Sequence, residues 1–230
     1  MIRLEDASKI YRRRGEQVVA FRPTSLEIST GDYVAVVGPS GSGKTTLLSM
    51  LGGMLSPDEG QIWIDGTSIY AGSVTARASL RRDKIGFVFQ TFNLVPYLTA
   101  IENVQVPLCL AGVHKDDQHR HALGLLERVG LGDRLGHKPS ELSIGQQQRV
   151  ALARTLANGP PIILADEPTG NLDPDSRACV LDFLDELHAE GRTIVMVTHD
   201  ATAASRAKRK LTLRDGSLVT SDSDGPARAA

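Results

Sequence analysis

The chain has 230 residues, of which 41% are hydrophobic and 23% charged, and its formal net charge is −1. This composition is typical of one globular domain with a large core, and it lacks the basic excess that favours binding to nucleic acid. Because the two cysteines stand apart and neither a signal peptide nor an apolar stretch of about 18 residues is visible, we expect a cytoplasmic chain with no membrane span of its own.

The first part of the chain predicts a strand, a glycine-rich loop and a helix in succession. Short β-rich segments end in the apolar run 33–37, which is typical of a buried strand. The next segment, GPSGSGKTT at 38–46, fits the pattern GxxxxGK[ST]. In such a loop the backbone N–H groups surround phosphates, Lys44 brings a positive charge to them, and the Thr45 hydroxyl reaches Mg²⁺. A plain Gly/Ser turn before a helix is the alternative interpretation.

Two further strands are predicted before the middle of the chain. Residues 61–66 resemble an antiparallel strand that ends in a turn, and residues 85–89 form a short buried strand. Gln90 follows the second of these strands directly. Its side chain should therefore emerge at a strand end, although a lone glutamine is a weak signal by itself.

Two helices are predicted next. Thr99 and Glu102 form a capping box, which indicates a helix that ends near Pro107. Apolar residues at helical spacing over 122–129 indicate one face of a second helix. For the histidines close to this helix a charged surface is favoured over a metal site, since no ordered ligand spacing accompanies His114, His119 and His121.

The stretch LSIGQQQRV, residues 142–150, contains no residue that acts alone as a strong acid, base or nucleophile. A helix is predicted to begin where Ser143 and Gly145 lie. A helix start presents unpaired N–H groups and partial positive charge, which suit an anion. We therefore expect an anion to bind at this turn.

The last part of the chain predicts a parallel β–α–β unit, with buried strands at 162–165 and 193–197 separated by a helix. Asp166 and Glu167 close the first strand, at the edge where open α/β sheets bind their ligands. One carboxylate is suited to Mg²⁺, and Glu167 could orient or deprotonate a water molecule. His199 follows the second strand and could donate a hydrogen bond to a phosphate. The alternatives are an acidic helix cap and a structural histidine.

Six motifs in this order and spacing resemble the nucleotide-binding subunit of ATP-binding-cassette (ABC) transporters: Gly38–Thr45, Gln90, Leu142–Gln146, Asp166-Glu167, Asn171-Leu172-Asp173 and His199. The resemblance covers roughly residues 1 to 218. It implies an α/β P-loop NTPase fold, with a RecA-like core, an N-terminal antiparallel β subdomain and an inserted helical subdomain. The implied limits are 1–90 and 158–218 for the core and β subdomain, 91–157 for the helical subdomain, 1–220 for the whole domain and 219–230 for a flexible tail.

The resemblance further implies that the chain binds ATP with Mg²⁺ and hydrolyses it. The expected nucleotide contacts are Tyr11, which would stack on adenine, together with Gly38, Pro39, Ser40, Gly41, Ser42, Gly43, Lys44, Thr45, Thr46, Ser143, Gly145 and Gln146. The expected Mg²⁺ ligands are Thr45, Gln90 and Asp166. The expected catalytic residues are Glu167, His199, Lys44 and Gln90. For Tyr11 an ordinary strand residue is the alternative, because aromatic residues favour strands.

A homodimer is also implied. In this family the stretch that corresponds to residues 142–146 meets the γ-phosphate bound by the glycine loop of a second copy, so that two chains enclose two ATP molecules. The family usually has glycine at the position of Ile144, and a β-branched residue resists positive φ. Either this position needs no positive φ or the loop is altered here. We expect the contact between the two chains to survive.

Within the family, the segments VFQTFNLVPYLTAIENVQVPL, LGGMLSPDEG and LADEPTGNLD are similar to the ATPases of lipoprotein release, macrolide export and cell division. This similarity implies a transmembrane permease partner, a peripheral position on the inner face of the membrane, and release or export of a lipoprotein, peptide or hydrophobic compound. One alternative is an ATPase that transmits mechanical signals to extracytoplasmic cell-wall enzymes. Another is a cassette that acts on nucleic acid or the ribosome, which the net charge disfavours. Residues 91–98 are expected to line the permease groove, with internal packing as the alternative.

Overall fold

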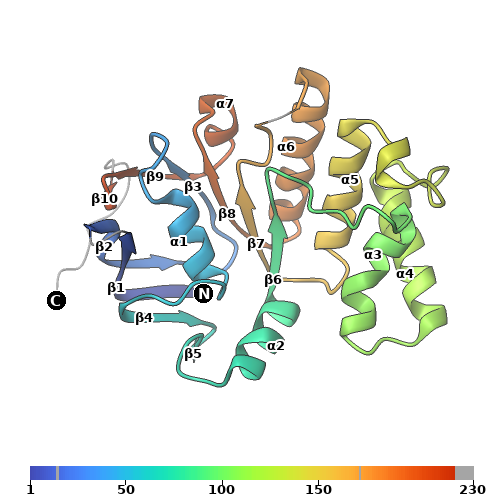
Figure 1. Cartoon of the computed structure of the whole chain (residues 1–230). Helices are drawn as coiled ribbons and strands as arrows, with labels where there is room; N and C mark the ends of the chain where they lie inside the picture. Colours follow the sequence, from blue (N-terminus) through green and yellow to red (C-terminus); the bar gives the residue numbers. More distant parts are fainter. Residues whose placement is uncertain (14–15, 171, 221–230) are drawn as a thin grey trace.

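The computed structural model describes residues 1–13, 16–170 and 172–220, and their strands form two sheets (Figure 1). The larger sheet has the strand order β10-β9-β3-β8-β7-β6, in which every pair from β9 to β6 is parallel. Its strands are β3 (Tyr33–Val37), β6 (Ile85–Val88), β7 (Ile162–Asp166), β8 (Thr193–Thr198), β9 (Arg209–Arg214) and β10 (Ser217–Thr220). The four buried strands predicted from apolar runs are therefore confirmed.

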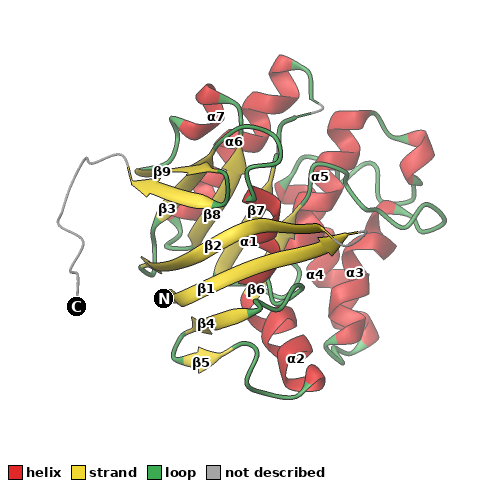
Figure 2. Cartoon of the chain, turned by 60° about the vertical axis from the view of Figure 1, so that its left-hand side comes forward, coloured by secondary structure: helices red, strands yellow, loops and turns green. Residues whose placement is uncertain are grey.

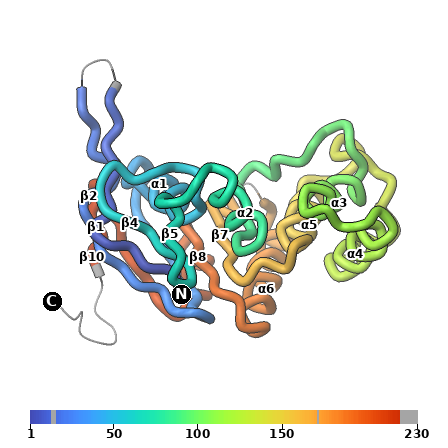
Figure 3. The backbone as a smooth tube through the Cα atoms, turned by 90° about the horizontal axis from the view of Figure 1, so that it is seen from below, coloured from blue at the N-terminus to red at the C-terminus, as the bar shows by residue number. Residues whose placement is uncertain are grey.

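The smaller sheet is antiparallel, in the order β2-β1-β4-β5, and lies over α1 in Figure 2. These elements are β1 (Ile2–Arg13), β2 (Glu16–Ile28), β4 (Glu59–Ile64), β5 (Thr67–Ser68) and α1 (Lys44–Leu51). Phe21, Leu47 and Ile62 belong to one buried cluster that fills the space between this sheet, α1 and the larger sheet. The far ends of β1 and β2 extend beyond the body of the molecule (Figure 3).

Helices cover the other side of the larger sheet. They are α3 (Ala100–Leu110), α4 (Lys115–Arg128), α5 (Ile144–Thr155), α6 (Pro174–Ala189) and α7 (Ala201–Ala204), with a 3₁₀ turn at Pro139–Glu141. Helix α2 (Val74–Lys84) lies on the side of α1, where Leu80 packs against the cluster that contains Leu47. Helices α3, α4 and α5 pack on one another, and Val104, Leu126 and Val150 contribute one buried residue each to a second cluster. The amphipathic helix predicted over 122–129 is confirmed as the end of α4. The subdomain limits at 91 and 157 stay a prediction.

Strand β3 connects the two buried clusters because its side chains alternate between the faces of the sheet. Tyr33 and Ala35 belong to the cluster on the helical side, whereas Val34 and Val36 belong to the cluster beneath the antiparallel sheet. A strand buried on both faces needs a continuous apolar run, which is what residues 33–37 provide. The glycine loop therefore starts from a rigid position in the middle of the sheet.

Two predicted boundaries are wrong. Helix α3 begins with the expected Thr99 capping box but continues past Pro107 to Leu110. Proline removes only its own N–H, and the Pro107 carbonyl still accepts a 3.0 Å bond from the Ala111 N–H, which closes the last turn. The tail expected from residue 219 begins too early, since Val219 pairs with Thr212 inside β10. Residues 221–230 lie outside the described part of the chain. Every described helix is too short or too polar to cross a membrane.

Candidate functional site

A cavity of about 700 Å³ opens where the carboxyl ends of the parallel strands meet the ends of β1 and β2. The loop after β3, Gln90 after β6, the end of β7 and His199 after β8 all contribute to its lining. This volume is in the range of small-molecule and cofactor sites. The lining residues are Tyr11, Val18, Val19, Ala20, Ser40, Gly41, Gly43, Lys44, Thr45, Thr46, Gln90, Asp166, Glu167 and His199. Most of the residues predicted to bind nucleotide are therefore brought together.

The glycine loop is shaped by close backbone contacts. Gly43 has φ 103°, and a Cβ there would lie 2.2 Å from the Ala20 carbonyl oxygen, so no other residue fits. A Cβ on Gly38 would lie 2.1 Å from the Leu213 carbonyl oxygen. These contacts hold the loop close to both sheets and leave the first N–H groups of α1 facing the cavity. Such a helix start is an anion site.

Lys44 is the first residue of α1, and its ammonium folds back along the loop. Its Nζ donates to the carbonyl oxygens of Gly38 and Pro39 at 2.8 and 3.0 Å, and the residue is 8% exposed. The positive charge is thus held within the loop itself. A charge in this position faces an anion that the loop surrounds, as the sequence pattern indicates.

Asp166 ends β7 opposite the first turn of α1. The Thr45 hydroxyl donates a hydrogen bond to Asp166 Oδ1 at 3.4 Å. Burial raises the pKa of Asp166, the Thr45 bond partly opposes that rise, and the neighbouring charge of Glu167 adds to it. A buried carboxylate beside a hydroxyl provides the hard oxygen donors that Mg²⁺ prefers, and a cation there would stabilise the ionised carboxylate. The donor set therefore fits Mg²⁺.

Glu167 and His199 form a hydrogen-bonded pair at the mouth of the cavity. His199 Nδ1 lies 2.9 Å from Glu167 Oε1, and the Thr198 hydroxyl and the His199 N–H donate to Oε2 at 3.1 and 3.3 Å. Glu167 also has φ 45°, an uncommon conformation for a residue with a side chain, which its N–H bond to the Val197 carbonyl helps to hold. The sequence predicted both residues near the cavity but not their contact with each other.

The predicted helix start at Ser143 is confirmed. The Ser143 hydroxyl accepts from the Gln146 N–H at 3.3 Å, and the Ser143 N–H donates to Gln146 Oε1 at 2.9 Å, which completes a capping box. Ile144 is the first residue of α5, has no positive φ and is 55% exposed. The first of the two expectations for Ile144 is therefore correct. Ser143, Gly145 and Gln146 take no part in lining the cavity of their own chain.

Sequence reasoning missed Val18, Val19 and Ala20, which line the cavity beside Tyr11. Val18 pairs with Tyr11 across the β1–β2 ladder, so the pairing of the two strands, which the sequence pattern did not assign, brings these residues to the site. The predicted motif at 171–173 is described only in part. Asn171 lies outside the described residues. Asp173 caps α6, because its side chain accepts hydrogen bonds from the Asp175 and Ser176 N–H groups.

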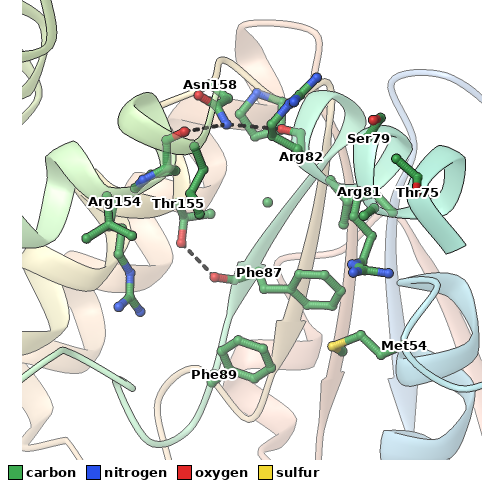
Figure 4. Close-up of a pocket in the computed structure, with 17 residues that line it drawn as sticks. Met54, Thr75, Ser79, Arg81, Arg82, Phe87, Phe89, Arg154, Thr155 and Asn158 are labelled. Carbon is green, nitrogen blue, oxygen red and sulfur yellow. Dashed lines mark hydrogen bonds between the residues drawn. The ribbon is translucent and has the colours of Figure 1, made fainter. Parts of the chain in front are cut away.

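A second hollow of about 700 Å³ lies between α2, β6, α3 and the end of α5 (Figure 4). Met54, Phe87 and Phe89 line it, and the Thr155 hydroxyl donates to the Phe87 carbonyl at 2.6 Å beside it. None of the residues 91–98 lines this hollow, and Val95 and Tyr97 among them are exposed, so their place in a permease groove stays a prediction. Phe92 and Leu94 instead pack partly buried against the helical core, because they follow a strand that runs into it.

Comparisons with known proteins agree with this geometry. The family model described as ABC transporter matches residues 21–170. The macrolide export ATP-binding/permease protein MacB of Hyphomonas neptunium is 46% identical over all of this chain, which spans only 36% of that protein. The ABC transporter ATP-binding protein YvrO of Bacillus subtilis is 46% identical over 95% of this chain and 96% of its own length.

Solved structures match equally well. The dimeric, post-hydrolysis structure of the ATP-binding cassette MJ0796 bound to ADP and Pi has a TM-score of 0.89 and 40% sequence identity, and covers 97% of this chain and 100% of its own. A second dimeric structure of the same cassette has a TM-score of 0.89 and 41% identity. On its sequence, its fold and the arrangement of its phosphate loop, the chain belongs to the ABC transporter family, as an ATP-binding domain of the ATPase class.

Proposed function

We propose that two copies of this chain bind and hydrolyse ATP with Mg²⁺ in two shared sites and thereby drive a transmembrane permease. In each site the loop at 38–46 surrounds the phosphates, with Lys44 beside them, and Tyr11 stacks on the adenine next to Val18. Thr45, Gln90 and Asp166 would hold Mg²⁺, which supplies charge neutralisation on the phosphates. The proximity of the Thr45 hydroxyl to the buried Asp166 carboxylate supports this assignment.

Glu167 is the general base in this proposal. Its carboxylate takes a proton from a water molecule while the water oxygen attacks the γ-phosphorus, and the bond to the bridging oxygen breaks with its electrons leaving on ADP. When both ring nitrogens of His199 carry a proton, Nδ1 donates to Glu167 and Nε2 donates to a γ-phosphate oxygen. The two residues therefore act as one unit that places both the base and a hydrogen-bond donor.

One observation carries the proposed dimer. The cavity contains every expected catalytic residue, yet Ser143, Gly145 and Gln146 lie outside it, at a helix start with its own anion-binding character. Two chains related by a twofold axis would place this turn of each copy over the γ-phosphate of the other. The two matched cassette structures are described as dimeric, which supports this pairing.

Dilution of the isolated chain tests the shared site. If each site needs a second copy, phosphate release per chain should rise in proportion to chain concentration below the dimer dissociation constant and level off above it. A coupled phosphate-release assay over a wide dilution series, with sedimentation of the same samples, measures both quantities. Constant turnover per chain in samples that sediment as monomers would show that one copy is sufficient.

The permease partner is proposed from the relatives that carry both parts in one protein, since the chain spans about a third of the length of the macrolide export proteins that it matches. The hollow in Figure 4 offers a place for a cytoplasmic helix of that partner. Apolar residues line it, and Arg81 and Arg82 lie at its side, which suits an amphipathic helix with acidic residues. The cargo class is a lipoprotein, peptide or hydrophobic compound, and the permease would hold the chain at the inner membrane face.

A charge placed in this groove should release the partner. Leu110 ends α3, lines the groove and is 73% exposed, so Leu110→Asp should remove the co-purifying membrane protein from a detergent extract with little effect on stability. Val219→Asp is the matched control, because Val219 is also apolar and exposed but lies on β10. Equal recovery of the membrane protein with both variants would place the docking site elsewhere.

A further inference from the structure

Gln148 is a buried polar residue to which the proposed function assigns no role. It lies on the inner side of α5 and is 0% exposed. Its Nε2 donates to the Pro168 carbonyl oxygen at 3.2 Å, and Pro168 is the residue next to Glu167. Its Oε1 is buried and has no hydrogen-bond partner among the described residues.

The amide of Gln148 has only one favourable orientation. If it were turned over, Oε1 would face the Pro168 carbonyl oxygen, and two acceptors would oppose each other. A buried acceptor without a partner costs free energy, and an apolar side chain of similar length would avoid that cost. A glutamine is therefore a poor choice for packing alone at this position. The hydrogen bond that its Nε2 donates to the turn after β7 accounts for a glutamine at this position.

The proposed catalytic residue Glu167 lies in this turn with an uncommon backbone conformation. Glu167 has φ 45°, and the Gly170 N–H donates to the Glu167 carbonyl at 3.1 Å to close the turn. Such a conformation persists only where its surroundings hold it. The bond from Gln148 is a contact to this turn from a different element of the fold, namely α5.

Helix α5 also contacts α6, which follows this turn in the chain. A Cβ on Gly145 would lie 2.4 Å from Ser176 Oγ, so the first turn of α5 and the first turn of α6 are in direct contact. In Figure 1 α5 lies between α6 and the pair α3 and α4. The start of α5, which the proposed dimer offers to the partner's ATP, and the turn that carries Glu167 thus belong to one packed unit.

We propose that Gln148 is a positioning residue for Glu167, which fixes the catalytic turn to the helix whose start serves the second site. The inference rests on the proposed role of Glu167. Gln148 does not touch the nucleotide cavity, so its loss should alter the chemical step and leave nucleotide binding unchanged.

Gln148→Met tests the proposal, because methionine has a similar length and cannot donate. We expect kcat for phosphate release to fall about tenfold, with KM for ATP unchanged within about twofold, since the base is misplaced but the phosphate loop is intact. Gln118→Met is the matched control, because Gln118 Nε2 also donates to a backbone carbonyl, that of Val113 at 2.7 Å, away from both the turn and the start of α5. A wild-type kcat in folded Gln148→Met, or an equal loss in both variants, overturns the proposal.

Gln148→Glu gives a readout that a purely structural role would not move. A protonated carboxyl has an O–H to donate to the Pro168 carbonyl, whereas an ionised one has none, and burial raises the pKa of a carboxyl into the range of the assay. The kcat of this variant, relative to wild type, should therefore recover as pH falls from about 9 to about 6. A ratio that stays flat over this range overturns the proposal, also where Gln148→Met fails to fold.

The proposed role of Gln148 and the proposed role of Glu167 can be tested independently of each other. In the Glu167→Gln background, addition of Gln148→Met should cause no further loss of single-turnover hydrolysis, because both changes act through the same carboxylate. An additional tenfold loss would show that Gln148 acts elsewhere. If Glu167→Gln alone keeps rapid turnover, the proposed function of Glu167 fails instead.

Discussion

Glu167→Gln should reduce ATP turnover by about 100- to 10 000-fold while ATP binding persists. Glutamine has the same shape, so the hydrogen bonds from Thr198 and His199 remain possible, but it cannot take a proton from water. Because ATP then stays in the site, two chains should remain joined around it. Phosphate release measures the turnover, and size-exclusion chromatography with ATP measures the dimer.

Glu186→Gln is a suitable control for this experiment, since Glu186 lies on the exposed side of α6, far along the helix from the cavity. It should release phosphate at the wild-type rate and show no stable dimer. Rapid turnover by Glu167→Gln would remove the general base from the mechanism. A slow variant that stays monomeric with saturating ATP would remove the closed dimer.

His199 and Glu167 illustrate what the sequence could and could not predict. Each follows an apolar run, and parallel neighbouring strands bring their ends to one edge, so the proximity of both residues followed from the pattern. Their direct contact depends on the left-handed φ of Glu167, which is stabilised by the Val197 carbonyl on the next strand. No local pattern encodes a conformation that a neighbouring strand imposes.

The hollow between α2, β6 and α3 shows another limit of reading along the chain. Residues 91–98 were expected to lie at a surface, and the structure divides them. Val95 and Tyr97 are exposed, whereas Phe92 and Leu94 are partly buried against the helical core, and the hollow of Figure 4 forms between α2, β6 and α3. Helix α2 has no fully buried residue and carries many charges, so its apolar periodicity is weak and it went unpredicted. Hollows between elements depend on how those elements pack, which a reading along the chain does not supply.

Ile144 is the point where the structure resolves an open question. Glycine is usual there in the family, and the residue proves to be the first helical position of α5, where any side chain fits. Its exposed side chain points away from the contact with α6, which Gly145 makes instead. The glycine that the fold requires in this turn is therefore Gly145.

Gly145→Asp should abolish the shared site for two separate reasons. A Cβ at this position would lie 2.4 Å from Ser176 Oγ and 3.3 Å from Ser176 Cβ, so the Ser176 side chain must rotate or the start of α5 must shift away from α6. A carboxylate at the helix start would also repel the phosphate that we place there and occupy the N–H groups meant for it. We expect turnover to fall at least about 100-fold, whereas one chain should still bind ATP through its own glycine loop.

The steric and electrostatic causes can be separated with smaller changes. Gly145→Ala adds only the clash, and Ser176→Gly in the same chain removes the side chain that it meets, so the double variant should recover most of the turnover that Gly145→Ala loses. Gly145→Asp should stay inactive in the Ser176→Gly background, because its charge remains. Fluorescent ATP binding and phosphate release on all four proteins measure both steps. Full recovery of Gly145→Asp by Ser176→Gly would mean that no anion is bound at this helix start, and the two-chain site would have to be abandoned.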